Sequence, residues 1–280
     1  MFGPRRWRGR LARGGAATEV EPASRSLIRY TLQSLTTRNY NAEYKDSARK
    51  YAYRFDAVLR RYVMRTLDPF LPPGRALEMG CYTGDVTELI ADHYDDVTVI
   101  EASEELVVAA SSRLGTRARF VHGTFETVEL PASYDAIFLI HTLEHLDDPV
   151  AVLQRVNGWL TDRGRLFVVV PNANAASRQI AVQMGLIPFN DAVTDDERVH
   201  GHRKTYRMDT LEREILAAGL RIVQTGGVFF KPLANFQFDK LIGGDVISDD
   251  YLEGCYRLGM HYPDLCASIW AVCARGDGRR

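Results

Sequence analysis

A glycine-rich turn between two glutamates is the part of the sequence whose spacing most clearly suggests chemistry. Glu78 lies two residues before Gly80, Gly84 closes the turn, and Glu101 follows 21 residues after Gly80. Glycines let a backbone approach a ligand closely, and a carboxylate about 20 residues further on can accept the hydroxyls of a ribose. Glu78 would repel a pyrophosphate but attract an ammonium group. The turn therefore favours an adenosine with an amino-acid tail over a nicotinamide dinucleotide.

These residues need a strand, a turn and a helix to position them, and the flanking sequence predicts that unit. Short apolar runs then alternate with helical spacing along most of the chain, which predicts an α/β fold with a Rossmann-like, seven-stranded, mostly parallel sheet and helices on both faces. We expect strands at 75–79, 97–100, 118–122, 134–140, 165–170, 220–225 and 265–274. The expected helices within this pattern are 86–93, 104–114, 149–160 and 208–218.

The rest of the chain is expected to form three additions to this sheet. Residues 1–23 are rich in Arg, Gly and Pro, which predicts a disordered basic tail. Residues 24–70 interleave tyrosines with Arg and Lys at amphipathic spacing, which predicts an N-terminal helical cap on the ligand-binding domain at 71–280. Residues 231–264 are too long for a structureless connection, so we expect a helix or a lid there, as a lid or oligomerisation insertion before the last strand.

Composition excludes several classes of function. The 280 residues are 46% hydrophobic and 25% charged, as expected for a globular protein. Five of the 35 basic residues are arginines within residues 1–13, so the remaining chain is acidic and no nucleic-acid partner is expected. No apolar run reaches the about 18 residues of a membrane span, and the four cysteines form no CxxC pair. We therefore expect a cytoplasmic protein with reduced thiols and no membrane partner.

A His-x-His pair at His200 and His202 raises the question of a metal site. Asp191, Asp195 and Asp196 lie nearby, but no third and fourth ligand follow at a convincing spacing. The prediction is therefore that no metal centre is present, while a divalent ion that assists acceptor binding stays open.

Taken in order, the motifs resemble those of the class I S-adenosylmethionine (SAM) dependent methyltransferases. Residues 78–84 (EMGCYTG) are similar to the family pattern E/D-x-G-x-G-x-G, with Tyr82 in place of the middle glycine. Residues 143–149 (LEHLDDP) match the L-E-H-x-x-D-P motif of the branch that includes ubiquinone-type O-methyltransferases and many natural-product enzymes. The resemblance covers roughly residues 74–225 and includes the fifth strand with its exit at Val170-Pro171-Asn172.

The resemblance implies SAM as the cofactor and S-adenosylhomocysteine as its product. Thr124 stands where the family often has an acid. Cofactor contacts are then expected from the glycine-rich turn, the two glutamates and the residues that follow the second, third and fourth strands, namely Glu78, Gly80, Cys81, Gly84, Glu101, Ala102, Thr124, Phe125 and His141.

The implied reaction is methyl transfer to an oxygen or nitrogen of a small-molecule acceptor, in specialised metabolism. Such an acceptor must lose a proton, and histidine suits that task near neutral pH. His202, followed four residues later by Tyr206, matches a family pattern that faces the acceptor, so it is the leading candidate for the base, ahead of His200 and His141. Acceptor contacts are expected from Tyr40, Tyr44, Arg178, Tyr206 and Lys231.

Other interpretations stay open beside this one. Glu144 and His145 of the branch motif are interpreted as structural hydrogen-bonding residues. An NAD-dependent oxidoreductase could use a similar sheet, although the glycine spacing with Glu78 argues against it. A non-catalytic binding module or a peptide-modifying enzyme is a further alternative, because intact cofactor positions do not exclude a peptide acceptor. The sequence determines neither the acceptor nor the oligomeric state, so a homo-oligomer stays possible.

Overall fold

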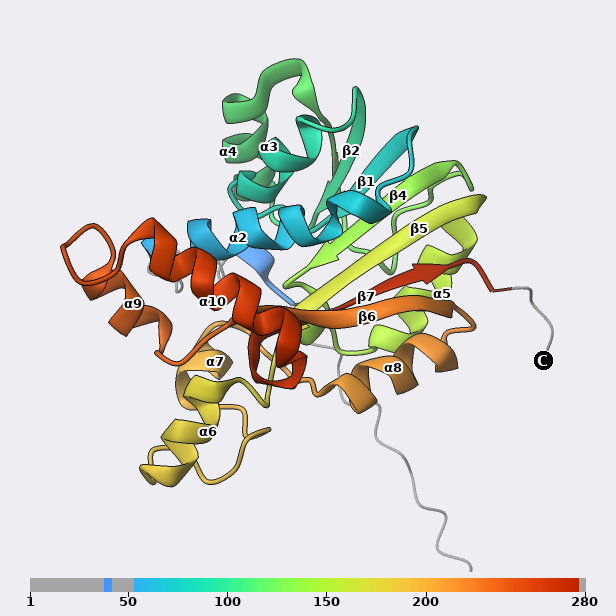
Figure 1. Ribbon diagram of the computed structural model, residues 1–280. Helices are drawn as coiled ribbons and strands as arrows, with labels where there is room; N and C mark the ends of the chain where they lie inside the picture. Colours follow the sequence, from blue (N-terminus) through green and yellow to red (C-terminus); the bar gives the residue numbers. More distant parts are fainter. Residues whose placement is uncertain (1–37, 42–52, 277–280) are drawn as a thin grey trace, which may run out of the picture. The chain divides into compact units, whose positions relative to one another are not determined.

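A seven-stranded sheet forms the centre of the protein (Figure 1). The computed structural model describes residues 38–41 and 53–276, and the described residues from 39 onward belong to one compact unit. The strands lie in the order β3-β2-β1-β4-β5-β7-β6, and β7 alone among them runs antiparallel to its neighbours. Their bounds are β1 (Arg75–Met79), β2 (Asp96–Glu101), β3 (Arg119–His122), β4 (Tyr134–Ile140), β5 (Leu160–Pro171), β6 (Arg221–Phe230) and β7 (Cys266–Ala274).

Strand order reverses between β1 and β4, and ligands of open α/β sheets bind beyond the carboxyl ends of strands at such a point. The helices that connect the strands begin at clear sequence signals. Ser103 and Asp148 cap two of them with their side chains, and Pro149 occupies the first turn of the second. The predicted α/β fold with a mostly parallel sheet is therefore confirmed.

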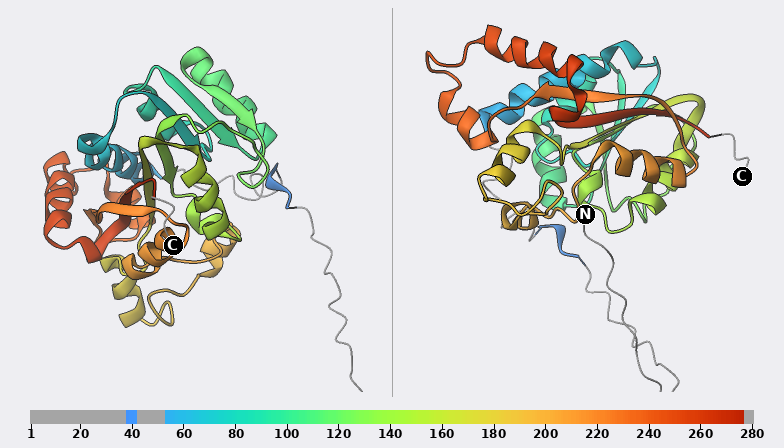
Figure 2. Two further views of the ribbon diagram at one scale, coloured as in Figure 1. Left: turned by 90° about the vertical axis from the view of Figure 1, so that its right-hand side faces the viewer. Right: turned by 60° about the horizontal axis from the view of Figure 1, so that its bottom comes forward.

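Helices cover both faces of the sheet (Figures 1 and 2). The helices are α2 (Arg54–Leu67), α3 (Asp85–Ala91), α4 (Glu104–Leu114), α5 (Pro149–Trp159), α6 (Ala176–Gln183), α7 (Asp195–Val199), α8 (Met208–Ala217), α9 (Asn235–Leu241) and α10 (Asp249–His261). Short 3-10 turns occur at η1 (Asp68–Phe70), η2 (Gly115–Arg117), η3 (Leu143–His145) and η4 (Pro263–Leu265).

Two apolar layers hold these helices to the sheet. Alternate residues of a strand point to opposite faces, and β4 shows this clearly. Phe138 joins a core with α2, α3, α9 and α10 on one face, while Ile137 and Leu139 join a core with α5 and α8 on the other. Both faces of the sheet are thus buried, as the nearly continuous apolar strands predicted.

The last third of the chain differs most from the prediction. Strand β6 continues to Phe230 through Gly226 and Gly227, where the sequence suggested an end near residue 225. A Cβ at Gly226 would lie 2.8 Å from the Trp270 ring on β7, so this glycine makes room for the ring rather than ending the strand. The segment 231–264 carries two helices, α9 and α10, which confirms the expected helix; its role as a lid or interface stays a prediction.

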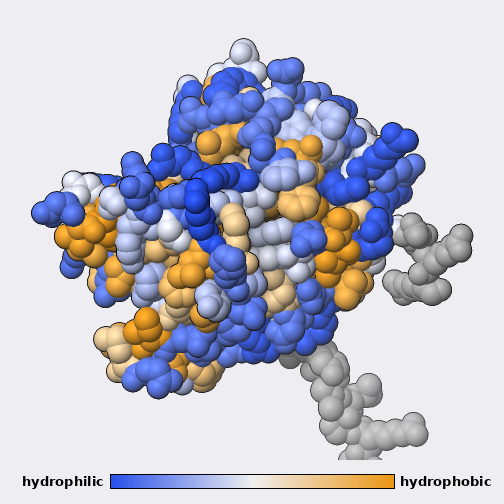
Figure 3. Space-filling model, in the orientation of Figure 1, coloured by the Kyte–Doolittle hydropathy of each residue, from blue (hydrophilic) through white to orange (hydrophobic). Residues whose placement is uncertain are grey.

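Some predictions fall on residues outside the described part of the chain. The basic tail at 1–23 lies there, as does Tyr44. Of the expected helical cap at 24–70, residues 38–41 and 53–70 are described, and the latter include α2. All four cysteines are buried and free. Among the described residues, no helix is long and apolar enough to span a bilayer. Figure 3 shows an apolar surface where Figure 1 places α6; the exposed apolar residues there and in the following loop are Ile180, Met184, Leu186 and Phe189.

Candidate functional site

Segments that follow β1, β2, β4 and β5 meet at the carboxyl edge of the sheet. The Gly80 amide donates to the carbonyl of Ile100 at 2.8 Å, which joins the end of β1 to the end of β2. A Cβ at Gly80 would lie 3.1 Å from the side chain of Thr142, directly after β4. The Arg203 amide donates to the carbonyl of Glu144 at 2.8 Å, which brings in the loop before α8. The turn after β1, the turn after β4 and the loop before α8 therefore lie at one edge of the sheet.

The turn after β1 uses left-handed backbone at three positions. Gly80 has φ 81° and Gly84 has φ 87°, and a Cβ at Gly84 would lie 2.8 Å from Leu114 of α4. Tyr82 has φ 50° although it is not glycine, and this conformation costs a non-glycine residue about 1–2 kcal/mol. The position where the family has its middle glycine therefore keeps the backbone conformation that glycine adopts most easily.

Glu101 holds that turn from the end of β2. Its side chain is only 8% exposed. Oε2 accepts from the amides of Cys81 at 3.1 Å and Tyr82 at 3.3 Å, and Oε1 accepts from the Ser103 amide at 3.0 Å. Burial raises the pKa of Glu101, and these backbone donors oppose that shift. The carboxylate is thus held in place by the backbone that surrounds it.

Glu78 lies beneath the same turn, on β1. It is 2% exposed, and its Oε2 accepts from the Thr87 hydroxyl of α3 at 2.5 Å. Burial raises the pKa of Glu78 to about 8, although the bond from Thr87 acts in the opposite direction. A positive charge brought close to Glu78 would lower that pKa again.

The residues expected on the adenine side lie next to the turn. The buried ring of Phe125 reaches 3.6 Å from the Cβ position of Gly80. The Thr124 hydroxyl bonds to the hydroxyl of Thr127 at 3.0 Å, and the Ala102 carbonyl lies 3.1 Å from Nε2 of His122. The structure therefore brings Phe125 to the turn and keeps Thr124 and Ala102 at the ends of β3 and β2.

Asn41 is a contact at this edge that the sequence analysis missed. Its Oδ1 accepts from the Ser103 hydroxyl at 2.7 Å, directly beside Glu101. The neighbouring Tyr40, expected at the acceptor, is partly buried in the same short helical stretch. An isolated asparagine gives no sequence signal for a partner 62 residues away.

His141 follows β4 directly and has φ 50°. Its Nε2 lies 2.9 Å from the hydroxyl of Ser268 on β7. Burial lowers the pKa of His141 to about 3, and the positive charges of Arg60, His202 and Lys231 add to that effect. His141 is therefore a neutral hydrogen-bonding residue at neutral pH and a weak base.

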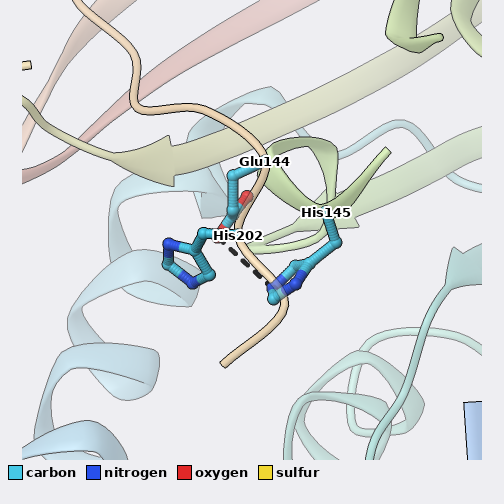
Figure 4. Close-up of side chains that lie close together, drawn as sticks. All are labelled: Glu144, His145 and His202. Carbon is cyan, nitrogen blue, oxygen red and sulfur yellow. Dashed lines mark ion pairs between the residues drawn. The ribbon is translucent and has the colours of Figure 1, made fainter. Parts of the chain in front are cut away.

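Glu144, His145 and His202 form a cluster, which Figure 4 shows where the turn after β4 meets the loop before α8. The two imidazole rings are 4.7 Å apart and nearly perpendicular, and His145 Nε2 lies 4.0 Å from Glu144 Oε1. The nitrogen and oxygen atoms that the three residues could offer an ion all lie within 4.8 Å of one another. We call these three residues the Glu–His cluster.

The Glu–His cluster corrects one interpretation of the branch motif. Glu144 is 1% exposed, and neither carboxylate oxygen has a hydrogen-bond partner among the described residues. Burial raises its pKa to about 8. Among the described residues, the expected structural hydrogen-bonding role is therefore wrong for the side chain of Glu144, which instead lies 4.0 Å from the His145 ring.

His200 and His202 do not act as a pair in the structure. His200 ends α7, and its Nδ1 bonds to the backbone carbonyl of Asp196 within that helix. His202 instead lies against His145, which comes 57 positions earlier in the chain. The His-x-His spacing in the sequence therefore did not predict the contact between His202 and His145.

The remaining acceptor candidates already form hydrogen bonds within the protein, but with different partners. Lys231 Nζ donates to Asn235 Oδ1 at 2.8 Å, and burial lowers its pKa to about 8. Arg178 donates to Glu197 at 2.6 Å and to backbone carbonyls of the loop before α7. The buried Tyr206 hydroxyl donates to Glu214 at 2.7 Å, and burial raises its pKa.

Comparison with known proteins adds an independent line of evidence. Residues 49–225 match the protein family described as methyltransferase domain. The chain is 26% identical over 200 residues to the ubiquinone biosynthesis O-methyltransferase of Xanthomonas euvesicatoria pv. vesicatoria, covering 68% of this chain and 80% of that one. The enzyme of the same name from Idiomarina loihiensis is 27% identical over 200 residues, covering 68% and 75%.

Solved structures agree at the level of the fold. A SAM-dependent methyltransferase from Thermotoga maritima has a TM-score of 0.59 and 17% identity, and covers 84% of this chain and 99% of that one. The family match spans more than half of the chain and includes the glycine-rich turn, Glu101 and the Glu–His cluster. The chain therefore belongs to the methyltransferase-domain family and is an enzyme that uses SAM as its methyl donor.

Proposed function

We propose that the enzyme methylates an oxygen or nitrogen atom of a small-molecule acceptor that binds beside the Glu–His cluster. The observation that carries this proposal is the position of the cluster. It lies in the turn after β4, whose Thr142 lies next to Gly80 of the cofactor turn. The Glu–His cluster, which we expect to accept the acceptor's proton, thus lies next to the expected position of the methyl donor.

The residues of the cofactor turn suit SAM. Backbone donors hold the Glu101 carboxylate beside the turn, where it is placed to accept from a ribose hydroxyl. Phe125 offers an apolar surface for the adenine, and Glu78 offers a negative charge for the ammonium. Bound SAM supplies an electrophilic methyl group on a positively charged sulfur.

The acceptor must lose a proton for transfer to a hydroxyl or a protonated amine. We assign that task to the Glu–His cluster, with His202 as the residue whose loss should matter most. His141, with its pKa of about 3, serves instead to orient groups at the end of β4. Lys231 and Asn235 supply polar contacts from the segment that follows β6. The name of the O-methyltransferase relatives supports an oxygen acceptor, and specialised metabolism stays part of the proposal.

His202→Ala tests this assignment. We expect turnover to fall by about 100-fold or more, as for loss of a group that handles the reacting proton, while the SAM dissociation constant changes less than about twofold. Turnover would be measured as S-adenosylhomocysteine release with a panel of simple catechols, phenols and primary amines. Product mass would identify the methylated atom class.

Two further variants make the test specific. His200→Ala should change turnover less than about threefold, because its ring is bonded to α7. His261→Ala, on the exposed end of α10, is the matched control for loss of an imidazole. Wild-type turnover in His202→Ala would remove the cluster from the mechanism, and methylation of peptides alone would overturn the small-molecule proposal.

A further inference from the structure

Glu144 is the least satisfied polar side chain at this edge. Both of its oxygens are buried without a hydrogen-bond partner among the described residues. An unsatisfied buried polar group costs about 1–3 kcal/mol, and a charged one costs more. Glu101 shows that this edge can satisfy a carboxylate with backbone donors, but the amides next to Glu144 bond within their own turn. Among the described residues, the Glu144 carboxylate contacts the His145 ring at 4.0 Å but accepts no hydrogen bond, so a bound ligand could supply the bond that these residues leave unmade.

Two imidazoles lie beside that carboxylate. His145 is the next residue in the chain, and His202 is brought in by the bond from the Arg203 amide to the Glu144 carbonyl. The donor atoms of the three residues lie within 4.8 Å of one another. Around a zinc ion with ligands at about 2.0–2.2 Å, donor atoms lie roughly 3.4 Å apart, so only small side-chain movements are needed to close the site.

We propose that Glu144, His145 and His202 bind a divalent metal ion, with Zn²⁺ as the ion that best fits this ligand set. Two neutral imidazoles and one carboxylate are the protein ligands of catalytic zinc sites, which leave a further coordination position open. The ion supplies the partner that the Glu144 carboxylate lacks. The prediction from sequence that no metal centre is present rested on the His200 and His202 pair, and the proposed ligand set uses only the second of these.

The site also specifies how the acceptor loses its proton, and this part rests on the proposed function. A hydroxyl that coordinates a divalent ion becomes a much stronger acid, as bound water does when its pKa falls from 15.7 to about 7. The O–H bond breaks and its proton passes to solvent, an oxygen lone pair then forms the bond to the methyl carbon, and the carbon–sulfur bond breaks to leave S-adenosylhomocysteine. His202 acts here as a ligand.

Metal binding is tested on the full chain without any acceptor. The protein is stripped with a chelator and dialysed, and Zn²⁺ affinity is measured by competition with a chromophoric chelator. We expect one Zn²⁺ per chain with a dissociation constant below about 1 μM, and Co²⁺ substitution should give visible absorption bands of a low-coordinate site. Failure to bind one equivalent of either ion would overturn the inference.

Variants locate the ion. Two single variants, Glu144→Gln and His202→Ala, should each weaken Zn²⁺ binding by about 10-fold to 100-fold or more. Glu144→Gln also keeps the volume of the side chain. Glu129→Gln, whose side chain is exposed, and His261→Ala are the matched controls and should bind like the wild type. Equal weakening in the controls would place the ion elsewhere and contradict the site. The two ligand variants are independent, so if one of them misfolds, the other still tests the site.

Activity separates this inference from the proposed function. Suppose that chelation abolishes turnover, that added Zn²⁺ restores it, and that SAM affinity stays constant. The metal-site inference and the proposed function then both stand. If turnover resists chelation but His202→Ala loses it, His202 acts as a free base; the inference then fails while the proposed function stands. If Zn²⁺ binds at the cluster but no small-molecule acceptor is methylated, the proposed function fails and the metal site stands.

Discussion

Two buried glutamates at the carboxyl edge of the sheet meet very different surroundings. Glu101 accepts three backbone hydrogen bonds, whereas Glu144 accepts none from the described residues. The reason lies in local backbone geometry. The amides of the turn after β1 belong to no strand and point at Glu101, while the amides of His145 and Leu146 bond to carbonyls of Thr142 and Leu143.

This difference separates two kinds of functional residue. Glu101 is part of a preformed surface, because the folded chain alone fixes the carboxylate and the turn that it holds. Glu144 contacts His145 but accepts no hydrogen bond from the described residues, so its energetics depend more on what the site binds. The cofactor side is therefore built into the fold, and the acceptor side is completed from outside.

The largest expected effect comes from Glu101→Ala, which would disrupt the preformed cofactor surface around the turn after β1. Removal of the carboxylate takes away a contact to the cofactor and releases the Cys81 and Tyr82 amides. Hydrogen bonds to charged groups contribute about 1.5–3 kcal/mol each, so SAM affinity should fall by about 100-fold or more in calorimetry. Glu129→Ala, at an exposed side chain, should bind normally. Unchanged affinity in Glu101→Ala would contradict the site map.

A smaller effect should appear in the pH dependence of SAM binding. The pKa of Glu78 is about 8 in the ligand-free protein, so the group is mostly protonated at pH 7. The ammonium of SAM favours the charged form, so binding releases a proton and affinity rises with pH, by up to about tenfold per unit, levelling off above about pH 8.

Calorimetry from pH 6 to 8.5 measures this dependence, and Glu78→Gln provides the comparison. The variant has no carboxyl group to titrate, so its affinity should change much less over that range. Equal slopes in the two proteins would show that Glu78 does not pair with the ammonium.

The smallest effect concerns stability, and it sharpens the contrast between the two glutamates. In metal-free protein, Glu144→Gln should change the free energy of unfolding by less than about 1 kcal/mol, because no hydrogen bond is lost. Glu101→Gln should lower it by about 1–3 kcal/mol, because it disturbs three bonds. Denaturant unfolding in the presence of a chelator measures both. A larger loss in Glu144→Gln would mean that its carboxylate has a partner in the fold.

The parts of the site that sequence predicted are local ones. The strand, turn and helix around Gly80 and the acid at Glu101 lie within about 25 residues, where spacing and apolar periodicity are informative. The strands were predicted for the same reason. The predicted end of β6 was too early because Gly226 makes room for Trp270 and Gly227 for Cys266, and both of these residues lie on β7.

Contacts between distant segments could not be read from sequence. Ser103 meets Asn41, and Arg178 meets Glu197 in a salt bridge instead of standing free for an acceptor. The Glu–His cluster joins the branch motif to a loop that follows two further elements, α6 and α7. Sequence supplied the residue types of the cluster, but only the three-dimensional arrangement showed which of them meet.

The bond between His141 and Ser268 has a consequence for how the enzyme matures during translation. The two residues lie 127 positions apart, and Ser268 belongs to β7, which inserts between β5 and β6. A ribosome makes the cofactor turn, His145 and His202 well before it makes that strand. A chain that ends before β7 therefore has the family motifs but lacks the Ser268 hydroxyl beside His141.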